Sequence, residues 1–104
     1  MSVLEGVLLE ELERIKRNIA SYNSILSSLP KGYIFMQEIN GNSYCYRKHR
    51  ENGKIISEYL GPNGSDIAKE AQSNYLERKR VEANLRILRK DEKRLIKALR
   101  HYGN

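Results

Sequence analysis

The chain has 104 residues, which is enough for one small domain with one modest hydrophobic core. Hydrophobic residues make up 39% of it and no apolar run approaches the length of a bilayer span, so a membrane-spanning protein is excluded. The net charge of +6 favours acidic partners. The single cysteine, Cys45, cannot form a disulfide within the chain, so we expect one cytoplasmic domain over residues 1–104.

Residues 2–29 are predicted to form one long helix. Ser2 can cap its start, and Glu5 stands at the position that completes a capping box. Pro30 ends the helix, because the residue before a proline is pushed out of the helical conformation. Apolar side chains recur every three or four positions and therefore form one stripe: Leu4, Leu8, Leu12, Ile15, Ile19, Tyr22, Leu26 and Leu29.

Residues 33–60 are predicted to form a three-stranded antiparallel meander. Asn40-Gly41 and Asn52-Gly53 each separate runs in which apolar and polar residues alternate. Asn-Gly is the pair that a two-residue type I′ turn requires, because both central residues of that turn have positive φ. Counting outward from the two turns pairs Phe35 with Tyr46, Gln37 with Tyr44, Tyr46 with Tyr59, Arg50 with Ile55, and Arg47 with Glu58.

The two faces of this meander differ in kind. The aromatic face carries Tyr33, Phe35, Ile39, Tyr44, Tyr46, Ile55 and Tyr59, with Gln37, Lys48, Arg50 and Ser57 among them. The aliphatic face carries Ile34, Met36, Cys45, Ile56 and Leu60, with Glu38, Arg47, His49, Lys54 and Glu58. The aliphatic face is typical of a surface that packs on helices. The aromatic face either covers core against a helix or binds nucleic acid or a partner protein.

Residues 65–102 are predicted to form a second long helix, after Gly61-Pro62-Asn63-Gly64 breaks the chain. Ser65 or Asp66 can cap its start. The helix is either continuous or kinked near Arg89–Lys93, where charged side chains are densest. A second apolar stripe runs along it: Ile67, Ala71, Leu85, Leu88, Leu95, Leu99 and Tyr102.

The two helical stripes are more apolar than one small sheet can cover. We therefore expect them to pair with each other or with a second chain, which would give a homodimer. Antiparallel pairing within the chain would also bring the acidic start of the first helix close to the basic end of the last. Together with the meander, the two helices predict an α+β fold.

Basic residues are concentrated in the second half of the chain. Residues 65–104 contain eleven basic and six acidic side chains, whereas residues 1–30 contain three basic and four acidic side chains. The meander contributes Lys48, Arg50 and Lys54, and the last helix contributes the run Arg78–Arg80. These cations are candidates for phosphate contacts.

Residues 29–60, LPKGYIFMQEINGNSYCYRKHRENGKIISEYL, resemble a small uncharacterised bacterial family with an L-P-K-G start and an R-E-N-G-K turn. That resemblance implies the helix, meander, helix order and no activity. Residues 33–80 are also similar to the three-stranded arm-site DNA-binding domains of tyrosine integrases. In those domains a meander inserts one face into the major groove, and a following helix often opens with a motif to which Lys69-Glu70-Ala71 is similar. The glycine-rich link differs, and the last helix is much longer here.

The residue types that catalysis or metal binding requires do not occur at useful spacing. His49 and His101 are far apart, and neither has a cysteine or carboxylate at ligand spacing. Cys45 lies in mid-strand among apolar neighbours, which indicates a buried, inert thiol. Gly61–Ser65 lacks the lysine and the spacing of a phosphate-binding loop. We therefore expect no catalytic residues, no metal and no cofactor.

These features predict a non-enzymatic basic protein, from a bacterium or mobile element, that binds nucleic acid and most of all duplex DNA. The alternative is a protein-binding module, such as a coiled-coil oligomer or a phage-type, anti-CRISPR-like inhibitor of a nucleic-acid-processing enzyme. Salt dependence separates the two, because phosphate binding weakens steeply as salt rises. The candidate binding residues are Gln37, Tyr44, Tyr46, Lys48, Arg50, Lys54, Tyr59, Arg78, Lys79 and Arg80.

Overall fold

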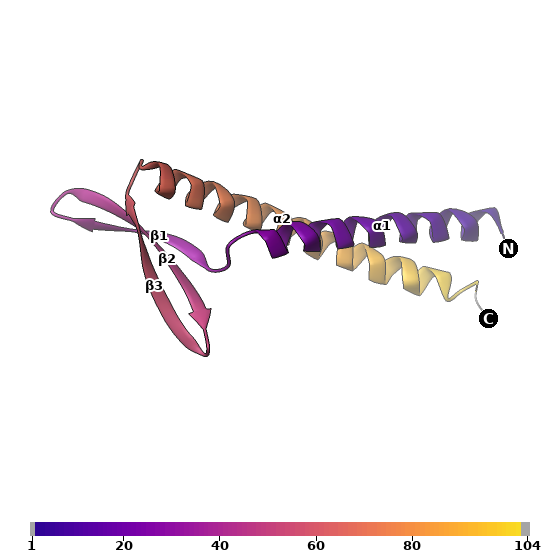
Figure 1. Ribbon diagram of the computed structural model, residues 1–104. Coiled ribbons are helices and arrows are strands. Elements are labelled where there is room, and N and C mark those ends of the chain that lie inside the picture. Colours follow the sequence, from indigo (N-terminus) through magenta and orange to yellow (C-terminus); the bar gives the residue numbers. More distant parts are fainter. Residues whose placement is uncertain (1, 103–104) are drawn as a thin grey trace. The chain divides into compact units, whose positions relative to one another are not determined.

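The computed structural model describes residues 2–102 and has the order helix, three strands, helix (Figure 1). The elements are α1 (Val3–Ser28), β1 (Tyr33–Ile39), β2 (Asn42–Glu51), β3 (Lys54–Pro62) and α2 (Asp66–Leu99). The predicted α+β fold is confirmed. α2 continues without interruption across residues 89–93, where the alternative prediction placed a kink.

The chain divides into two compact units, each of which is described by itself. The helical unit consists of α1 together with residues 80–102, and the sheet unit consists of residues 29–79. The expectation of a single domain over residues 1–104 stays a prediction. Among residues 2–102, no helix combines the length and the apolar character needed to cross a membrane.

The start and end of α1 follow from local chemistry. The backbone N–H of Glu5 donates a hydrogen bond to Ser2 Oγ at 3.0 Å, as the predicted cap requires. The helix ends at Ser28, two residues before Pro30. The observed bounds therefore lie within one residue of the prediction at each end.

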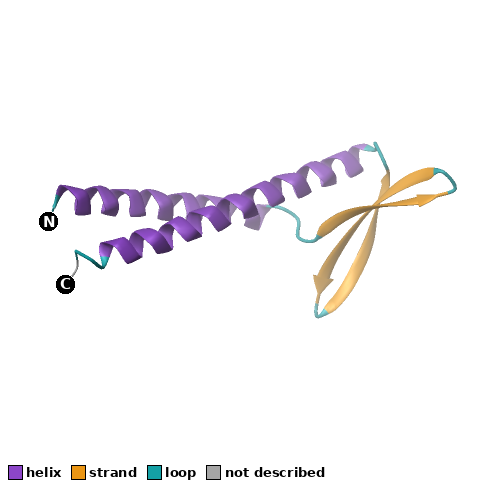
Figure 2. Cartoon of the chain, turned by 180° about the vertical axis from the view of Figure 1, so that it is seen from behind, coloured by secondary structure: helices purple, strands orange, loops and turns teal. Residues whose placement is uncertain are grey.

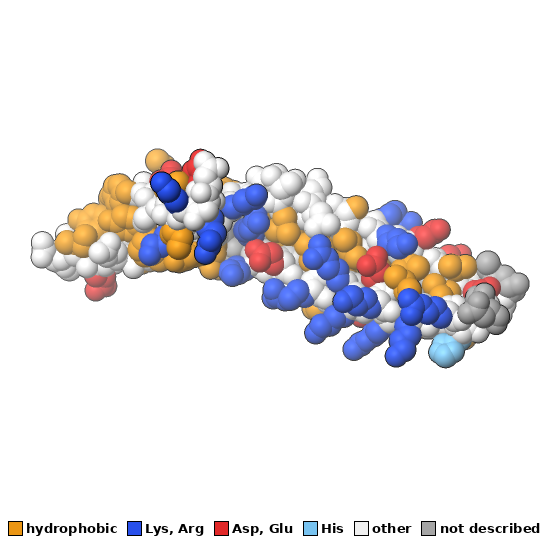
Figure 3. Space-filling view, turned by 90° about the horizontal axis from the view of Figure 1, so that it is seen from below, with side chains coloured by type: hydrophobic (Ala, Val, Ile, Leu, Met, Phe, Trp, Pro, Cys, Tyr) orange, Lys and Arg blue, Asp and Glu red, His pale blue; other side chains and the backbone are white. Residues whose placement is uncertain are grey.

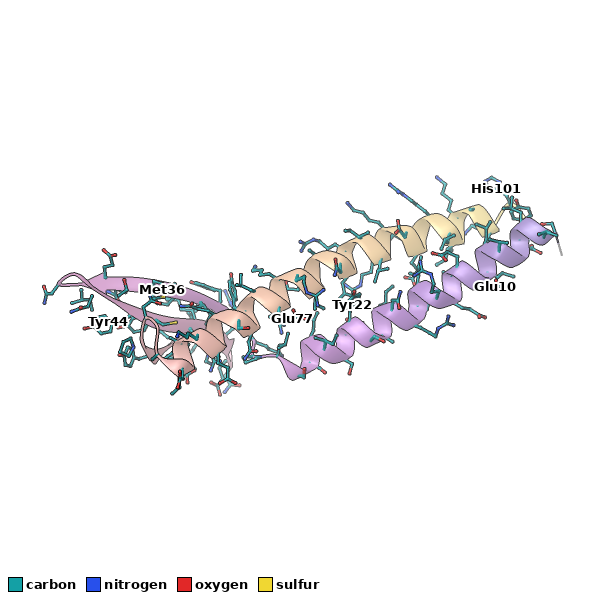
Figure 4. All side chains as sticks on the ribbon, turned by 90° about the horizontal axis from the view of Figure 1, so that it is seen from above. Glu10, Tyr22, Met36, Tyr44, Glu77 and His101 are labelled. Atoms are coloured by element: carbon teal, nitrogen blue, oxygen red, sulfur yellow. The ribbon has the colours of Figure 1, made fainter. Side chains whose placement is uncertain are left out.

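The interior of the helical unit is formed by the two apolar stripes. α1 and the later part of α2 lie side by side (Figure 2). Ile15 of α1 and Val81 and Leu85 of α2 are buried. Tyr22 lies between the helices, where it lines a hollow with Leu88 (Figure 4). The later part of the second stripe thus packs on the first stripe within the chain, and pairing with a second chain stays a prediction.

The sheet has the predicted strand order β1-β2-β3 and the predicted register. Phe35 pairs with Tyr46, and Tyr46 pairs with Tyr59. Both turns have positive φ at each central residue, 51° and 80° at Asn40-Gly41 and 53° and 78° at Asn52-Gly53. These values are the ones that type I′ turns require, so the turn prediction is confirmed.

One irregularity in the sheet was not predicted. Tyr46 pairs with Tyr59 but Cys45 pairs with Gly61, so Leu60 is an extra residue in β3 and forms a β-bulge. Gly61 has a φ of 128°, which favours glycine, and a Cβ atom there would also lie 2.9 Å from Ser65 Oγ where β3 leads into α2. The bulge lets β3 continue to Pro62, two residues beyond its predicted end.

Residues 66–79 of α2 lie on the aliphatic face of the sheet. Ser65 Oγ accepts a hydrogen bond from the N–H of Ala68 at 3.3 Å, which caps the helix. Ala68 and Cys45 are fully buried, and Gln72 Nε2 lies 3.5 Å from Met36 Sδ. A hollow of about 260 Å³ is lined from both elements, including Ile34, Leu60, Ile67 and Ala71. The aliphatic face therefore packs on a helix, as predicted.

Candidate functional site

The aromatic face of the sheet carries a continuous ladder of rings. Ring centroids lie 6.3 Å apart for Tyr33 and Phe35, 5.2 Å for Phe35 and Tyr46, 5.4 Å for Tyr46 and Tyr59, and 6.2 Å for Tyr59 and Tyr44. The ladder is open to solvent, since Tyr33 is 48% and Tyr59 is 53% exposed. An exposed aromatic surface of this size is typical of an interaction site, because monomeric proteins rarely leave large apolar patches uncovered.

Two of the rings and one cation cover one another. Phe35 and Tyr46 are stacked on each other with an interplanar angle of 17°. The ammonium group of Lys48 lies 4.9 Å from the centroid of Phe35, in cation–π geometry. Part of the flat surface of these rings is therefore already occupied by neighbours on the same face.

Charge on the sheet is separated between its two faces. The register places Lys48 and Arg50 on the aromatic face, opposite Ser57 and Ile55. All three carboxylates of the meander, those of Glu38, Glu51 and Glu58, belong to the other face. There Arg47 Nη2 pairs with Glu58 Oε2 at 2.6 Å, which confirms the predicted cross-strand ion pair. The aromatic face is therefore cationic and carries no acid.

A hollow of about 370 Å³ lies at one end of the aromatic face. Tyr33, Lys48, Arg50 and Ile55 line it, together with Gly32 and His49. Two cations, an aromatic ring and an aliphatic side chain thus border one space. A phosphate or carboxylate with an attached apolar group fits that combination of side chains.

The structure brings six of the ten candidate residues onto one surface. Gln37, Tyr44, Tyr46, Lys48, Arg50 and Tyr59 all lie on the aromatic face. Lys54 lies opposite Glu51 in the pairing of β2 with β3, and both belong to the other face.

The three candidates in α2 are placed differently from one another. Arg78 Nη1 donates to the Leu29 carbonyl oxygen at 3.4 Å, so it helps to hold the start of the sheet unit. Lys79 is exposed, with its ammonium group 5.5 Å from the centroid of Tyr75. Arg80 belongs to the helical unit.

Two features of the surface were missed from the sequence. The first is Gly32, beside the hollow, because an L-P-K-G segment directly before a strand is a signal for a tight entry. The second is a row of cations in α2 between Arg86 and Arg100, whose alternating spacing of four and three residues was visible in the sequence.

The side chains gathered on the aromatic face are of kinds that bind ligands. Among the described residues, no group of three or more His, Cys, Asp or Glu side chains could hold a metal ion. The only ion pair that His49 makes within residues 2–102 is a contact of 3.6 Å from Nε2 to Glu51 Oε2. The aromatic face has no carboxylate that could act as a general base.

A family described as a domain of unknown function, DUF6788, matches residues 7–70 of the chain. That match covers most of α1, the whole meander and the start of α2. No curated protein and no solved structure matches the chain.

Proposed function

This chain belongs to the DUF6788 family, and we propose that it is a non-enzymatic nucleic-acid-binding protein whose ligand is duplex DNA. One observation carries the proposal: the uncovered face of the sheet combines a ladder of aromatic rings with Lys48 and Arg50 and no carboxylate. Cations of this kind neutralise phosphates, and an acid-free face avoids repelling them.

The orientation of the rings favours a duplex over a single strand. Single strands bind by stacking unpaired bases on open aromatic faces. Phe35 and Tyr46 instead cover each other, and Lys48 lies over Phe35. The same face carries tyrosine hydroxyls and the amide of Gln37, which are groups that contact sugars and base edges in a groove. The similarity to integrase arm-site domains supports the same mode.

A protein-binding module is the second candidate, and a specific observation favours it. Ile39 and Ile55 on the same face are 44% and 66% exposed. Exposed aliphatic side chains next to tyrosines are typical of the anchor residues of protein interfaces. An acidic protein, such as an enzyme that processes nucleic acid, would meet this surface through Lys48 and Arg50. Binding of that kind depends less on salt than phosphate binding does.

The test compares two double charge reversals in a gel shift on random-sequence duplex and single-stranded DNA. K48E with R50E should weaken duplex binding about 100-fold at low salt, because two phosphate contacts become repulsive. K16E with R17E is the matched control, since both residues are exposed cations of α1. Arg14 is less suitable, because its hydrogen bonds lower the pKa of Glu11 and tie the two side chains together.

Each result has one meaning for the proposal. Circular dichroism and the Tm show first that both variants remain folded. A much larger loss for the sheet variant than for the α1 variant supports the proposal. Equal losses would show diffuse attraction to net charge and would contradict a role for the sheet. Tighter binding of the single strand would contradict the assignment to duplex DNA.

A further inference from the structure

A second cationic surface runs along the later part of α2. We call it the basic stripe, and it consists of Arg86, Lys90, Lys93, Lys97 and Arg100. Successive members are separated by four, three, four and three residues, so they lie on one side of an α-helix. Arg100 directly follows α2, and its N–H still donates to the Ile96 carbonyl oxygen at 3.2 Å, so the helical spacing continues to the last member.

The stripe points away from the interior of the helical unit. All five cations are exposed, whereas Val81 and Leu85 on the opposite side of the helix are buried. Figure 3 shows Lys and Arg side chains gathered in a row along the helical part of the chain. In Figure 4 nitrogen-tipped side chains project from this part of α2 on the side away from α1.

Few carboxylates lie near the stripe within residues 2–102: Glu82, four residues before Arg86, lines a hollow with it. The carboxylates between the ends of the stripe, those of Asp91 and Glu92, are half-buried and lie off the stripe. Within residues 2–102 no salt bridge joins a carboxylate of α1 to any member of the stripe. The expected closeness of the acidic start of α1 to the basic end of the last helix therefore does not use up these cations.

From this geometry we infer that the basic stripe binds the sugar–phosphate backbone of the nucleic acid that the aromatic face recognises. The inference rests on the proposed function and assigns the stripe a separate, sequence-independent part of it. A charged helix side could be mere solvated surface. A solvated surface normally mixes both signs of charge, whereas a straight row of one sign over four turns matches a linear polyanion.

The dimensions fit a stretch of duplex backbone. Fourteen residues separate the ends of the stripe, which corresponds to about 21 Å of helix. Duplex DNA carries one charge per about 1.7 Å of its axis, so that length presents about 12 phosphates, of which about half lie on each strand. A straight row of five cations can therefore contact several phosphates along this length, and such contacts raise affinity without reading bases.

The test measures how the dissociation constant of a duplex depends on salt, using the full chain. Each phosphate contact adds about 0.9 to the slope of log K against log salt. K93Q with K97Q should lower that slope by about 1.8, equally for duplexes of unrelated sequence. K16Q with R17Q, which removes the same charge from α1, should leave the slope within about 0.3 of the parent's because counterions are released only at contact sites.

The sheet variant K48Q with R50Q separates failure of this inference from failure of the proposed function. If K93Q with K97Q leaves the slope unchanged while the sheet variant lowers it, the inferred role of the basic stripe is overturned and the proposed function stands. If the stripe variant lowers the slope and the sheet variant does not, the stripe is supported and the sheet assignment fails. A parent chain that binds no duplex overturns both.

Anionic lipid is the competing ligand. Vesicles of phosphatidylserine and phosphatidylcholine in equal parts provide the comparison. Loss of vesicle binding in K93Q with K97Q, with an unchanged duplex slope, would assign the stripe to a lipid surface and overturn the inference. Lysine-to-glutamine changes at exposed helix positions leave the fold intact, because glutamine is also a good helix former.

Discussion

Gly32 lies where the chain enters β1, and its backbone φ is 98°. A side chain there would overlap the Lys48 carbonyl oxygen and approach His49 Cβ to 2.9 Å. We therefore expect Gly32→Ala to lower the free energy of unfolding by more than the roughly 1–2 kcal/mol that a left-handed backbone alone costs a residue with a side chain. Urea denaturation followed by circular dichroism measures the change.

Gly64 supplies a control for that substitution. Its φ is 87°, but a Cβ atom there meets nothing within 4 Å. Gly64→Ala should therefore show only the backbone cost, and the difference between the two variants isolates the overlap with Lys48. Equal destabilisation by the two substitutions would mean that the Lys48 backbone moves away from the new Cβ atom without a measurable loss of unfolding free energy.

At the scale of the hairpins, the two Asn-Gly turns decide the register of the whole sheet. Gly41 and Gly53 each have φ near 80°, which a β-branched residue adopts only with strain. Gly41→Val and Gly53→Val should each lower the free energy of unfolding by about 1–3 kcal/mol. Differential scanning calorimetry should then show a clear fall in Tm for both variants.

Ser57→Val tests whether the turn position, and not valine itself, causes that fall. Ser57 lies in the middle of β3 and is exposed. A β-branched residue is favoured there, because it fits the pleated surface of a strand. We expect this variant to keep or raise the parent's Tm. A parent-like Tm in the two turn variants would refute the type I′ assignment.

The three strands also show how alternation separates two kinds of surface. Lys48 and Arg47 are neighbours in β2, yet Arg47 pairs with Glu58 on the covered side and Lys48 lies over Phe35 on the open side. Successive side chains of a strand point to opposite faces. A shift of one residue in the pairing of β2 would therefore move Lys48 to the covered face and Arg47 to the open face. Register therefore controls whether the aromatic face is cationic.

For the whole molecule, stability depends on the few side chains that are fully removed from water. Leu85 is 4% exposed and Leu76, in the same helix, is 67% exposed. Leu85→Ala should cost about 2–5 kcal/mol of unfolding free energy, since it leaves a cavity between the helices. Leu76→Ala should cost no more than about 0.5 kcal/mol. Chemical denaturation of both variants measures the contrast.

Similar losses of unfolding free energy for Leu85→Ala and Leu76→Ala would contradict the conclusion that Leu85 is buried and Leu76 is exposed. They would mean that Leu76 is covered in solution, for instance by a second copy of the chain. In that case the loss for Leu76→Ala would depend on protein concentration, because a partner subunit stabilises the folded state by mass action.

The local elements of this protein were determined by its sequence alone. Ser2 and Pro30 set the bounds of α1, and the Asn-Gly pairs set the turns, because caps and turns depend on residues within a few positions of each other. The same locality explains why the pairing of Phe35 with Tyr46 and of Arg47 with Glu58 could be counted in advance. Six candidate residues fell on one face for that reason.

Only the tertiary structure decided that the aromatic face of the sheet stays uncovered. Alternation distinguishes two faces, but the choice between them depends on where the link after β3 directs α2. The chain passes from β3 to α2 through the bulge at Leu60 and through Gly61, whose φ is 128°, and α2 then lies on the aliphatic side, so the ladder of rings stays open. In the same way, the packing of Val81 and Leu85 against α1 left the basic stripe in solvent. Such contacts join residues far apart in the chain, and their free energy depends on the surface that both partners bury together.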